Sequence, residues 1–153
     1  MSRHEIIEFV KRTTEMTVQT GPFAGLKLAD VQTWGHEEIG SQLLGIYERE
    51  LRPVLLELAS RRPTLVINVG CAEGYYAVGL ARLIPTARVH AFDIDERAQN
   101  VCRTNAALNG ASDRIVVEGI CSPQRLREIS AGHTNILVVV DCEGAEKELL
   151  GKR

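Results

Sequence analysis

A short turn of this chain carries two glycines and a carboxylate directly after an apolar segment, namely Gly70, Glu73 and Gly74. Because they lack a Cβ, the two glycines would let a ligand approach the backbone, and the N–H groups of a following helix would face that ligand. A second carboxylate, Asp93, follows the next apolar segment about twenty residues later, where it could accept both hydroxyls of a ribose. This spacing predicts a nucleoside site. The alternatives are a tight turn with nothing bound and, for Asp93, a turn or helix-capping role.

The residues inside the turn indicate which nucleoside would fit. A dinucleotide site of the GxGxxG type requires a glycine where this chain has Ala72. Glu73 would also repel a pyrophosphate, so an NAD-linked oxidoreductase domain is the less favoured alternative. The same carboxylate would suit a ligand that carries an ammonium group and a sulfonium. We therefore expect S-adenosylmethionine as the cofactor.

Alternating strands and helices must position these residues. Apolar runs bounded by turn residues predict strands within residues 64–69, 89–92, 114–118 and 136–140. Helical periodicity and capping residues predict helices at residues 75–84, 96–108, 123–129 and 143–150. This alternation favours an α/β fold with a doubly wound parallel sheet, in which ligands bind at the carboxyl ends of the strands.

Residues 1–60 form the other predicted part of the chain. Apolar spacing indicates helices at residues 5–16, 37–50 and 54–59, with Pro53 ending or kinking the second of them. Turn residues allow a short strand or hairpin at residues 26–31. We expect a mostly helical N-terminal extension on a core of residues 61–153, the two forming one compact domain.

Several segments together resemble one enzyme family. Residues 66–81, VINVGCAEGYYAVGLA, resemble the first motif of class I S-adenosylmethionine-dependent methyltransferases, and residues 91–98, AFDIDERA, resemble their acidic motif after the second strand. Residues 135–150 contain DCEGAE, which is similar to the D-x-E-G-A-E signature of the FkbM-like methyltransferases. The NxxLNG spacing of residues 105–110 is typical of that group. The resemblance implies a Rossmann-like core and methyl transfer to a small-molecule or sugar hydroxyl.

The resemblance also implies a set of residues around the cofactor: Asn68, Gly70, Glu73, Gly74, Asp93, Ile94, Ile120 and Cys121. In this set Asn68 would shape the turn, the turn residues would hold the methionine part, and Asp93 would hold the ribose hydroxyls. Ile94 would pack on one face of the adenine. Ile120 and Cys121 would border its other face and its edge.

Two carboxylates, Asp141 and Glu143, follow the fourth predicted strand and, by the resemblance, would lie near the methyl group and the acceptor. An acceptor oxygen or nitrogen would attack the sulfonium methyl in line, so alignment would supply much of the catalysis while a base removes the acceptor proton. Either carboxylate could be that base, bind a metal or cap a turn. The cysteines and histidines are too widely separated to predict a metal site or a disulfide framework.

Composition bounds the class of protein. The 153 residues, 44% hydrophobic and 25% charged, suit one globular domain. A formal net charge of −2 and a pI of about 6.1 give no general attraction to nucleic acid or anionic membranes. The longest aliphatic run, at residues 136–140, is too short to span a bilayer, and the N-terminus does not resemble a secretory signal. We therefore expect a cytoplasmic protein with no nucleic-acid or membrane partner. That it is an enzyme with a small-molecule acceptor is what the resemblance implies.

The sequence stops one helix after the fourth predicted strand, whereas class I methyltransferases carry further strands that shape the acceptor side. Either the chain is part of a longer protein or it is a natural reduced form. A catalytically silent methyltransferase-like module that acts through association is therefore another alternative. In the usual class I order the strand at residues 136–140 would form a sheet edge, and we expect a homo-oligomer that covers it.

Overall fold

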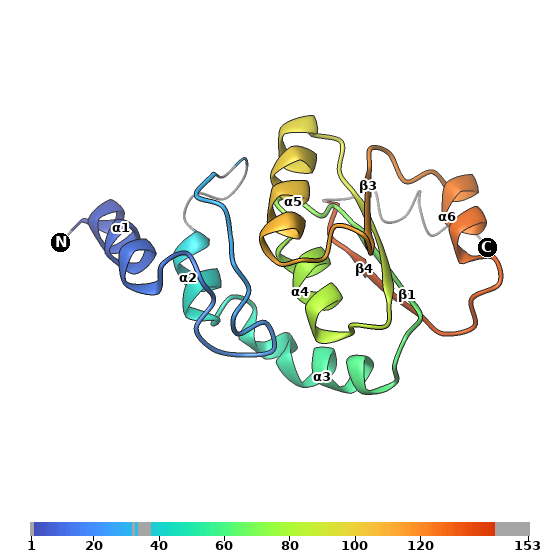
Figure 1. Cartoon of the computed structure of the whole chain (residues 1–153), viewed down its shortest axis with the longest axis horizontal. Coiled ribbons are helices and arrows are strands. Elements are labelled where there is room, and N and C mark those ends of the chain that lie inside the picture. Colours follow the sequence, from blue (N-terminus) through green and yellow to red (C-terminus); the bar gives the residue numbers. More distant parts are fainter. Residues whose placement is uncertain (1, 32, 34–37, 143–153) are drawn as a thin grey trace.

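A parallel sheet with the strand order β3-β2-β1-β4 is the centre of the fold (Figure 1). The computed structural model describes residues 2–31, 33 and 38–142. The strands are β1 (Leu65–Val69), β2 (Arg88–Phe92), β3 (Ile115–Glu118) and β4 (Ile136–Val140). The helices are α1 (Arg3–Thr14), α2 (Ile39–Leu44), the 3-10 helix η1 (Arg49–Leu51), α3 (Arg52–Ser60), α4 (Tyr75–Leu83), α5 (Glu96–Leu108) and α6 (Pro123–Ser130).

The register of the sheet brings the ends of three strands level. Val69, the last residue of β1, pairs with the last residue of β2, Phe92, and with the last residue of β4, Val140. The residues that directly follow these strands, Gly70, Asp93 and Asp141, therefore leave the sheet at the same edge. The order also confirms the prediction that the fourth strand lies beside the first, at one edge of the described sheet. Every residue of β1 is buried, as expected of a central strand covered on both faces.

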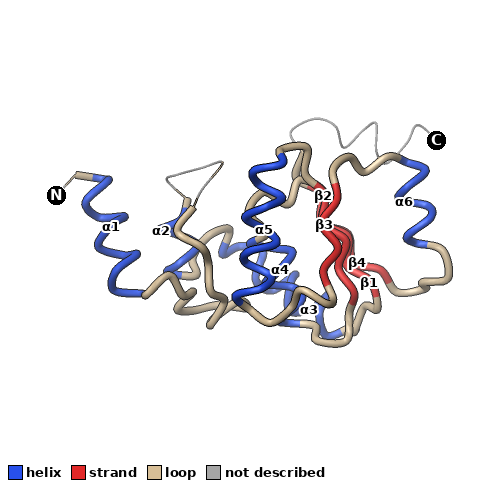
Figure 2. Tube along the Cα trace, turned by 45° about the horizontal axis from the view of Figure 1, so that its top comes forward, coloured by secondary structure: helices blue, strands red, loops and turns tan. Residues whose placement is uncertain are grey.

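Helices cover both faces of this sheet (Figure 2). On one face lie α4 and α5, where strand residues such as Val66 and Val89 join helix residues such as Val78 in a buried cluster. On the other face lies α6, whose Leu126 and Ile129 pack against a second buried cluster. Apolar side chains are thus buried on both faces, which confirms the predicted doubly wound α/β fold.

The helix predicted at residues 37–50 is wrong in its extent, because α2 ends at Leu44. Gly45 ends the helix with a φ of +73°. A Cβ at Gly45 would lie only 2.0 Å from the carbonyl oxygen of Thr20, so the bend also depends on a contact with a distant segment. Pro53 does not break a longer helix, since it stands in the first turn of α3. The N–H groups there have no partner within the helix, so the missing N–H of proline loses no helical hydrogen bond.

The possible strand at residues 26–31 is not formed, and this region makes only an isolated antiparallel bridge between Thr17 and Lys27. The part of the chain just before residues 26–31 is nevertheless well packed. The ring of Phe23 lies against α4, where a Cβ added to Gly79 would meet it at 2.7 Å. The N-terminal part therefore shares a buried cluster with the sheet. The boundary at residues 60 and 61 stays a prediction.

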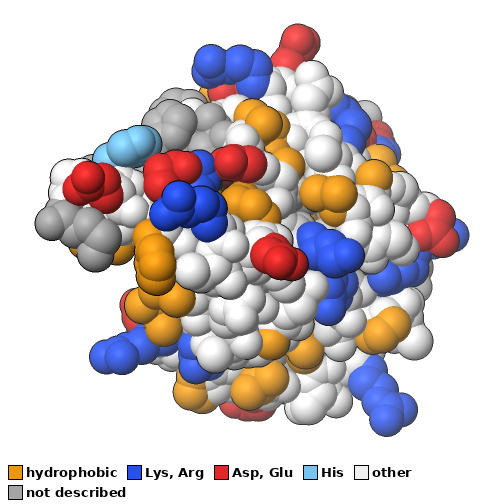
Figure 3. Space-filling model, turned by 60° about the vertical axis from the view of Figure 1, so that its left-hand side comes forward, with side chains coloured by type: hydrophobic (Ala, Val, Ile, Leu, Met, Phe, Trp, Pro, Cys, Tyr) orange, Lys and Arg blue, Asp and Glu red, His pale blue; other side chains and the backbone are white. Residues whose placement is uncertain are grey.

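The N-terminal helices carry apolar residues that reach the surface, among them Ile6, Phe9, Val54 and Leu56. In the view with this side turned forward, apolar, acidic and basic side chains are interspersed (Figure 3). No large field of one sign covers that view. Within the described ranges, no helix is both long and apolar enough to cross a membrane.

Candidate functional site

The turn between β1 and α4 is held by backbone hydrogen bonds to the neighbouring strand. The N–H groups of Gly70 and Cys71 donate to the carbonyl oxygen of Phe92 at 2.8 and 2.9 Å. Ala72 adopts a left-handed conformation, with a φ of +45°. Gly74 caps α4 through its backbone, and no side chain caps this N-terminus in the part of the chain that the structure describes. The positive end of the α4 dipole therefore points toward the edge where the strands end.

The two glycines of the turn are required by packing as well as by backbone conformation. A Cβ at Gly70 would lie 1.8 Å from the carbonyl oxygen of Asp141, which follows β4. A Cβ at Gly74 would lie 2.6 Å from Sγ of Cys102 in α5. Both glycines have a positive φ, of +74° and +87°. Their role at a ligand stays a prediction, because close protein contacts alone account for glycine at both positions.

Asp93 is held rigidly at the end of β2. One carboxylate oxygen accepts from the N–H of Ala72 in the turn at 2.8 Å, and the other accepts from the N–H of Asp95 at 2.9 Å. The helix cap of α5 is Asp95, which accepts from the N–H of Arg97. Helix capping therefore does not explain Asp93, whereas its bond to the N–H two residues further on is the turn role that the sequence left open as an alternative. Since each carboxylate oxygen has two lone pairs, Asp93 keeps acceptor capacity for a hydroxyl.

Two isoleucines flank this carboxylate at the strand ends. Ile94 follows β2 and is 81% exposed, and Ile120 follows β3 and is 77% exposed. Such exposure leaves a large apolar side chain in water and is unfavourable unless something covers it. Cys121 next to Ile120 is half-buried, and burial raises the pKa of its thiol. The contact of these side chains with an adenine ring stays a prediction.

Glu73 contacts the N-terminal part of the chain. Its Oε1 accepts from the hydroxyl and the N–H of Thr33, at 2.7 and 2.5 Å. Its carbonyl oxygen accepts from Nδ2 of Asn105 in α5 at 2.8 Å. Sequence analysis assigned no role to Thr33 or Asn105, because residues this far apart in sequence leave no local pattern that predicts the contact.

Asn68 is 1% exposed on β1 beneath the turn. Its Nδ2 donates to the carbonyl oxygen of Val139 at 3.5 Å, whereas its Oδ1 is a buried atom with no hydrogen-bond partner among the described residues. A buried acceptor without a donor is costly. The atom is therefore free to accept a bond from a ligand or a water molecule.

The acceptor side of the edge is only partly described. The N–H of Asp141 donates to Val69, and its side chain is exposed, whereas Glu143 lies outside the described residues. The hydroxyl of Tyr47 interacts electrostatically with the Asp141 carboxylate, although the two residues are far apart in the sequence. Burial, with the carboxylates of Glu48, Glu38 and Asp141, raises the pKa of its hydroxyl, so Tyr47 stays protonated.

In the described part of the chain no group of His, Cys, Asp and Glu side chains could hold a metal ion.

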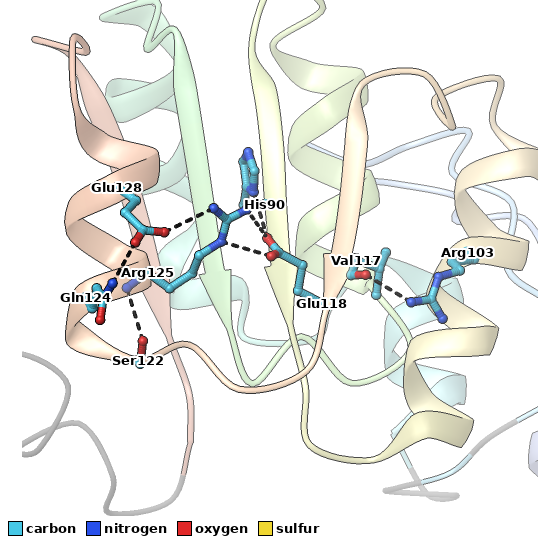
Figure 4. A network of polar contacts seen from close by, with 8 residues as sticks. All are labelled: His90, Arg103, Val117, Glu118, Ser122, Gln124, Arg125 and Glu128. Carbon is cyan, nitrogen blue, oxygen red and sulfur yellow. Dashed lines mark hydrogen bonds and ion pairs between the residues drawn. The ribbon is translucent and has the colours of Figure 1, made fainter.

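A network of polar contacts braces the end of β3 next to Ile120 (Figure 4). Glu118 accepts from Arg125 of α6 at 2.9 Å and lies 3.0 Å from Nδ1 of His90 on β2. On the other side, Arg103 of α5 donates to the carbonyl oxygen of Val117 at 2.9 Å. These contacts join β3 to helices on both faces of the sheet.

The Glu118 carboxylate should make the stability of the fold depend on pH. Burial raises the pKa of Glu118, but the hydrogen bonds from Arg125 and His90 outweigh burial and hold it below its ordinary value. A carboxyl with a lowered pKa in the folded state contributes stability above its unfolded pKa and loses it as the pH falls through the folded value. Glu118→Gln should therefore lower the free energy of unfolding at pH 7. The deficit should shrink as the pH is lowered toward about 3. Urea titrations at both pH values would check this, and a deficit independent of pH would contradict it.

Comparison with known proteins identifies the family. The family model for ribosomal protein L11 methyltransferase (PrmA) matches residues 54–140, which is more than half of the chain. The chain belongs to this methyltransferase family. The match covers β1 to β4 with α3 to α6, and hence the turn, Asp93 and both isoleucines. It confirms the prediction of a class I S-adenosylmethionine-dependent methyltransferase family and of the cofactor that such a family uses.

Curated relatives of the methyltransferase chain act on different acceptors, according to their names. One is a probable cobalt-precorrin-6B C(15)-methyltransferase of Pyrobaculum calidifontis, 35% identical over 82 residues, which are 52% of this chain and 42% of the relative. Another is a tRNA1(Val) (adenine(37)-N6)-methyltransferase of Porphyromonas gingivalis, 38% identical over 61 residues, which are 40% of this chain and 24% of the relative. The chain thus spans less than half the length of the curated relatives it matches.

Solved structures support the fold. Cofactor-bound Rv0187 from MTB has a TM-score of 0.52 at 18% identity over 92% of this chain and 53% of its own. An O-methyltransferase from Bacillus cereus in complex with SAH has a TM-score of 0.51 at 17% identity, covering 90% of this chain and 54% of its own. At such identities the likeness confirms the predicted methyltransferase type of sheet.

One prediction about partners was wrong. The expected exclusion of nucleic acid conflicts with relatives that are tRNA methyltransferases. The net charge of a chain says little about one local acceptor surface. The matched region contains the carboxyl edge of the sheet, and its relatives act on different acceptors according to their names.

Proposed function

We propose that this chain binds S-adenosylmethionine along the carboxyl edge of the sheet and supplies the cofactor-binding part of a methyltransferase. The observation that carries the proposal is Asp93, a carboxylate fixed by two backbone N–H groups between the turn and α5. Two exposed apolar side chains belong to the same edge: Ile94, which follows Asp93 in the chain, and Ile120, which follows the neighbouring strand β3. A polar group that can accept ribose hydroxyls at the same edge as apolar side chains suits a nucleoside.

The residues present fit the cofactor in two further respects. The α4 N-terminus has no side-chain cap among the described residues and would face the carboxylate of the methionine part. Among the described residues the buried Oδ1 of Asn68 has no donor, and an ammonium group or a bridging water could supply one. Within this proposal Gly70 and Gly74 keep Cβ atoms out of the turn, and Cys121 borders the adenine edge.

S-adenosylmethionine supplies an electrophilic methyl group when bound, and the chain's own residues orient the reactants and move a proton. Asp141, exposed at the end of β4, is our proposed base for the acceptor proton. Tyr47 has a raised pKa and keeps its proton, with Glu38 as a hydrogen-bond partner of its hydroxyl. Glu143 completes the proposed acceptor side in the D-x-E-G-A-E motif, outside the described residues.

The acceptor is the finer part of the proposal. The FkbM-like motif at residues 141–146 supports transfer to a hydroxyl. The names of the relatives add a corrin-precursor carbon and a tRNA base nitrogen as acceptor types. A methyl-transfer assay with one acceptor of each type would distinguish these. If S-adenosylmethionine binds but no acceptor is methylated, a silent association module becomes the better description.

Isothermal titration with S-adenosylmethionine and S-adenosylhomocysteine tests the cofactor site independently of the acceptor. We expect saturable binding of both ligands, with a dissociation constant below about 1 mM, a modest affinity of about −4 kcal/mol or better. NAD should not compete, since Ala72 and Glu73 disfavour a pyrophosphate in the turn. Absence of binding at millimolar ligand would contradict the proposal, and preferential binding of NAD would favour an oxidoreductase domain.

A further inference from the structure

An irregular segment of the N-terminal part, which we call the strap, is attached to the methyltransferase core by side chains of α5 and the turn. It comprises residues 27–31 and Thr33. At one end, the side chain of Asn109 accepts from the N–H of Lys27 at 3.0 Å and donates to its carbonyl oxygen at 2.8 Å. At the other end, Thr33 donates twice to Glu73. The strap therefore leads from the C-terminus of α5 to the glycine turn.

Between these two attachments lies Asn105, a polar side chain that is only 1% exposed. Its Oδ1 accepts from the N–H of Ala29 in the strap at 2.7 Å, and its Nδ2 donates to the carbonyl oxygen of Glu73 at 2.8 Å. Both partners are backbone groups, so rotating the amide by half a turn would set donor against donor and acceptor against acceptor. The orientation of Asn105 is thus fixed, and it joins two segments that are distant in sequence.

The bond to Glu73 bears directly on the conformation of the turn. A carbonyl oxygen and the N–H of the next residue share one rigid peptide plane, so fixing the Glu73 carbonyl also fixes the N–H of Gly74. That N–H donates to Cys71 at 2.8 Å and closes the turn. Ala72, inside the same turn, has a positive φ that an alanine adopts only at a cost. The turn therefore depends on contacts from outside, and Asn105 supplies a buried one.

We propose that Asn105 is a positioning residue of the cofactor site, which holds the glycine turn in its binding conformation and ties it to the strap. The inference rests on the proposed function, since the turn is where we place the methionine part. Asn105 touches no ligand in this scheme. It acts through Glu73 and Ala29. Replacing Asn105 should therefore change cofactor affinity more than replacing an asparagine that bridges two segments elsewhere in the fold.

Asn135 provides the matched control. It too bridges segments through backbone groups, because its Nδ2 donates to the carbonyl oxygens of Arg61 and Arg62 at 2.6 and 3.1 Å. It precedes β4 and therefore lies at the amino edge of the sheet, opposite the site. Asn105→Ala should weaken S-adenosylhomocysteine binding roughly fivefold to tenfold, the equivalent of one lost hydrogen bond. Asn135→Ala should leave it within about twofold, the size expected for a site that is not coupled.

Amide hydrogen exchange without ligand separates this inference from the proposed function. Asn105→Ala should speed exchange at Ala29 and Gly74, and Asn135→Ala should not. If the wild type binds no S-adenosylhomocysteine, the proposed function fails, and exchange alone then decides about Asn105. Unchanged exchange at both amides would overturn the positioning role, as would equal affinities of Asn105→Ala and Asn135→Ala.

A near-isosteric variant keeps the test valid if Asn105→Ala does not fold. Asn105→Asp retains an acceptor for the N–H of Ala29 but loses the donor to Glu73. We expect Ala29 to remain protected while exchange at Gly74 becomes faster and affinity falls. Wild-type affinity with wild-type exchange at Gly74 in this variant would overturn the proposal.

Discussion

Replacing Asp93 by alanine is expected to weaken S-adenosylmethionine and S-adenosylhomocysteine binding tenfold to a hundredfold. Hydrogen bonds to a charged acceptor contribute roughly 1.5 to 3 kcal/mol, which corresponds to this range of affinity. The loss has two sources in the structure. The ribose hydroxyls lose their acceptor, and the N–H groups of Ala72 and Asp95 lose the carboxylate that joins the turn to the start of α5.

The neighbouring Asp95 makes the experiment specific. Asp95→Ala also removes an acidic side chain, but one that caps α5 by accepting from the N–H of Arg97. It should lower stability modestly, as loss of an N-cap does, and leave affinity nearly unchanged. Titration calorimetry on both variants, with urea unfolding as the control for folding, distinguishes the two roles. An Asp93→Ala protein with wild-type affinity would exclude Asp93 as the ribose ligand.

The alternating core of the fold could be predicted because its signals are local. The helix at residues 96–108 was predicted with the bounds that α5 has, since an N-cap aspartate and a glycine just after the helix mark its two ends. Ser122 likewise caps α6 by accepting from the N–H of Arg125. The four apolar runs became four strands, and their register follows from burial on both faces.

The N-terminal part was predicted less well because distant contacts determine its conformation. The end of α2 at Gly45 depends on a close approach to Thr20, and apolar periodicity alone could not indicate it. The strap lacks regular structure, and several of its backbone groups bond to side chains instead, as the N–H of Ala29 does to Asn105. Tyr47 interacts electrostatically with Asp141 at the end of β4, and no local sequence pattern predicts an interaction between residues so far apart.

The candidate site shows the same division. Asp93, Ile94 and Ile120 follow strand ends, which the predicted order of elements required, because strand ends in a parallel sheet meet at one edge. Their contacts with the cofactor stay predictions. What the sequence could not reveal is why the turn contains glycine. A pattern of glycines indicates close approach, but it does not say whether a ligand or another loop approaches. In the structure the approaching atom at Gly70 is the carbonyl oxygen of Asp141.

Gly70→Ala is therefore expected to destabilise the fold itself, by about 2 to 5 kcal/mol. A left-handed conformation costs alanine about 1 to 2 kcal/mol, and forcing extra atoms into a packed site costs a further 1 to 3 kcal/mol. Both terms apply, because Gly70 has a φ of +74° and its Cβ would lie 1.8 Å from a backbone oxygen. A backbone atom cannot rotate away as a side chain does, so the exits of β1 and β4 would have to separate.

A substitution at Gly110 separates the cost of the left-handed backbone from the cost of the steric contact. It also has a positive φ, of +62°, but a Cβ there would meet nothing within 4 Å. Gly110→Ala should therefore show only the conformational cost, about 1 kcal/mol. The difference between the two variants in urea unfolding measures the contact between Gly70 and Asp141. Equal losses would mean that the two loops can move apart freely, and then the level strand ends that bring Asp93, the turn and Asp141 together could not be a rigid platform for the cofactor.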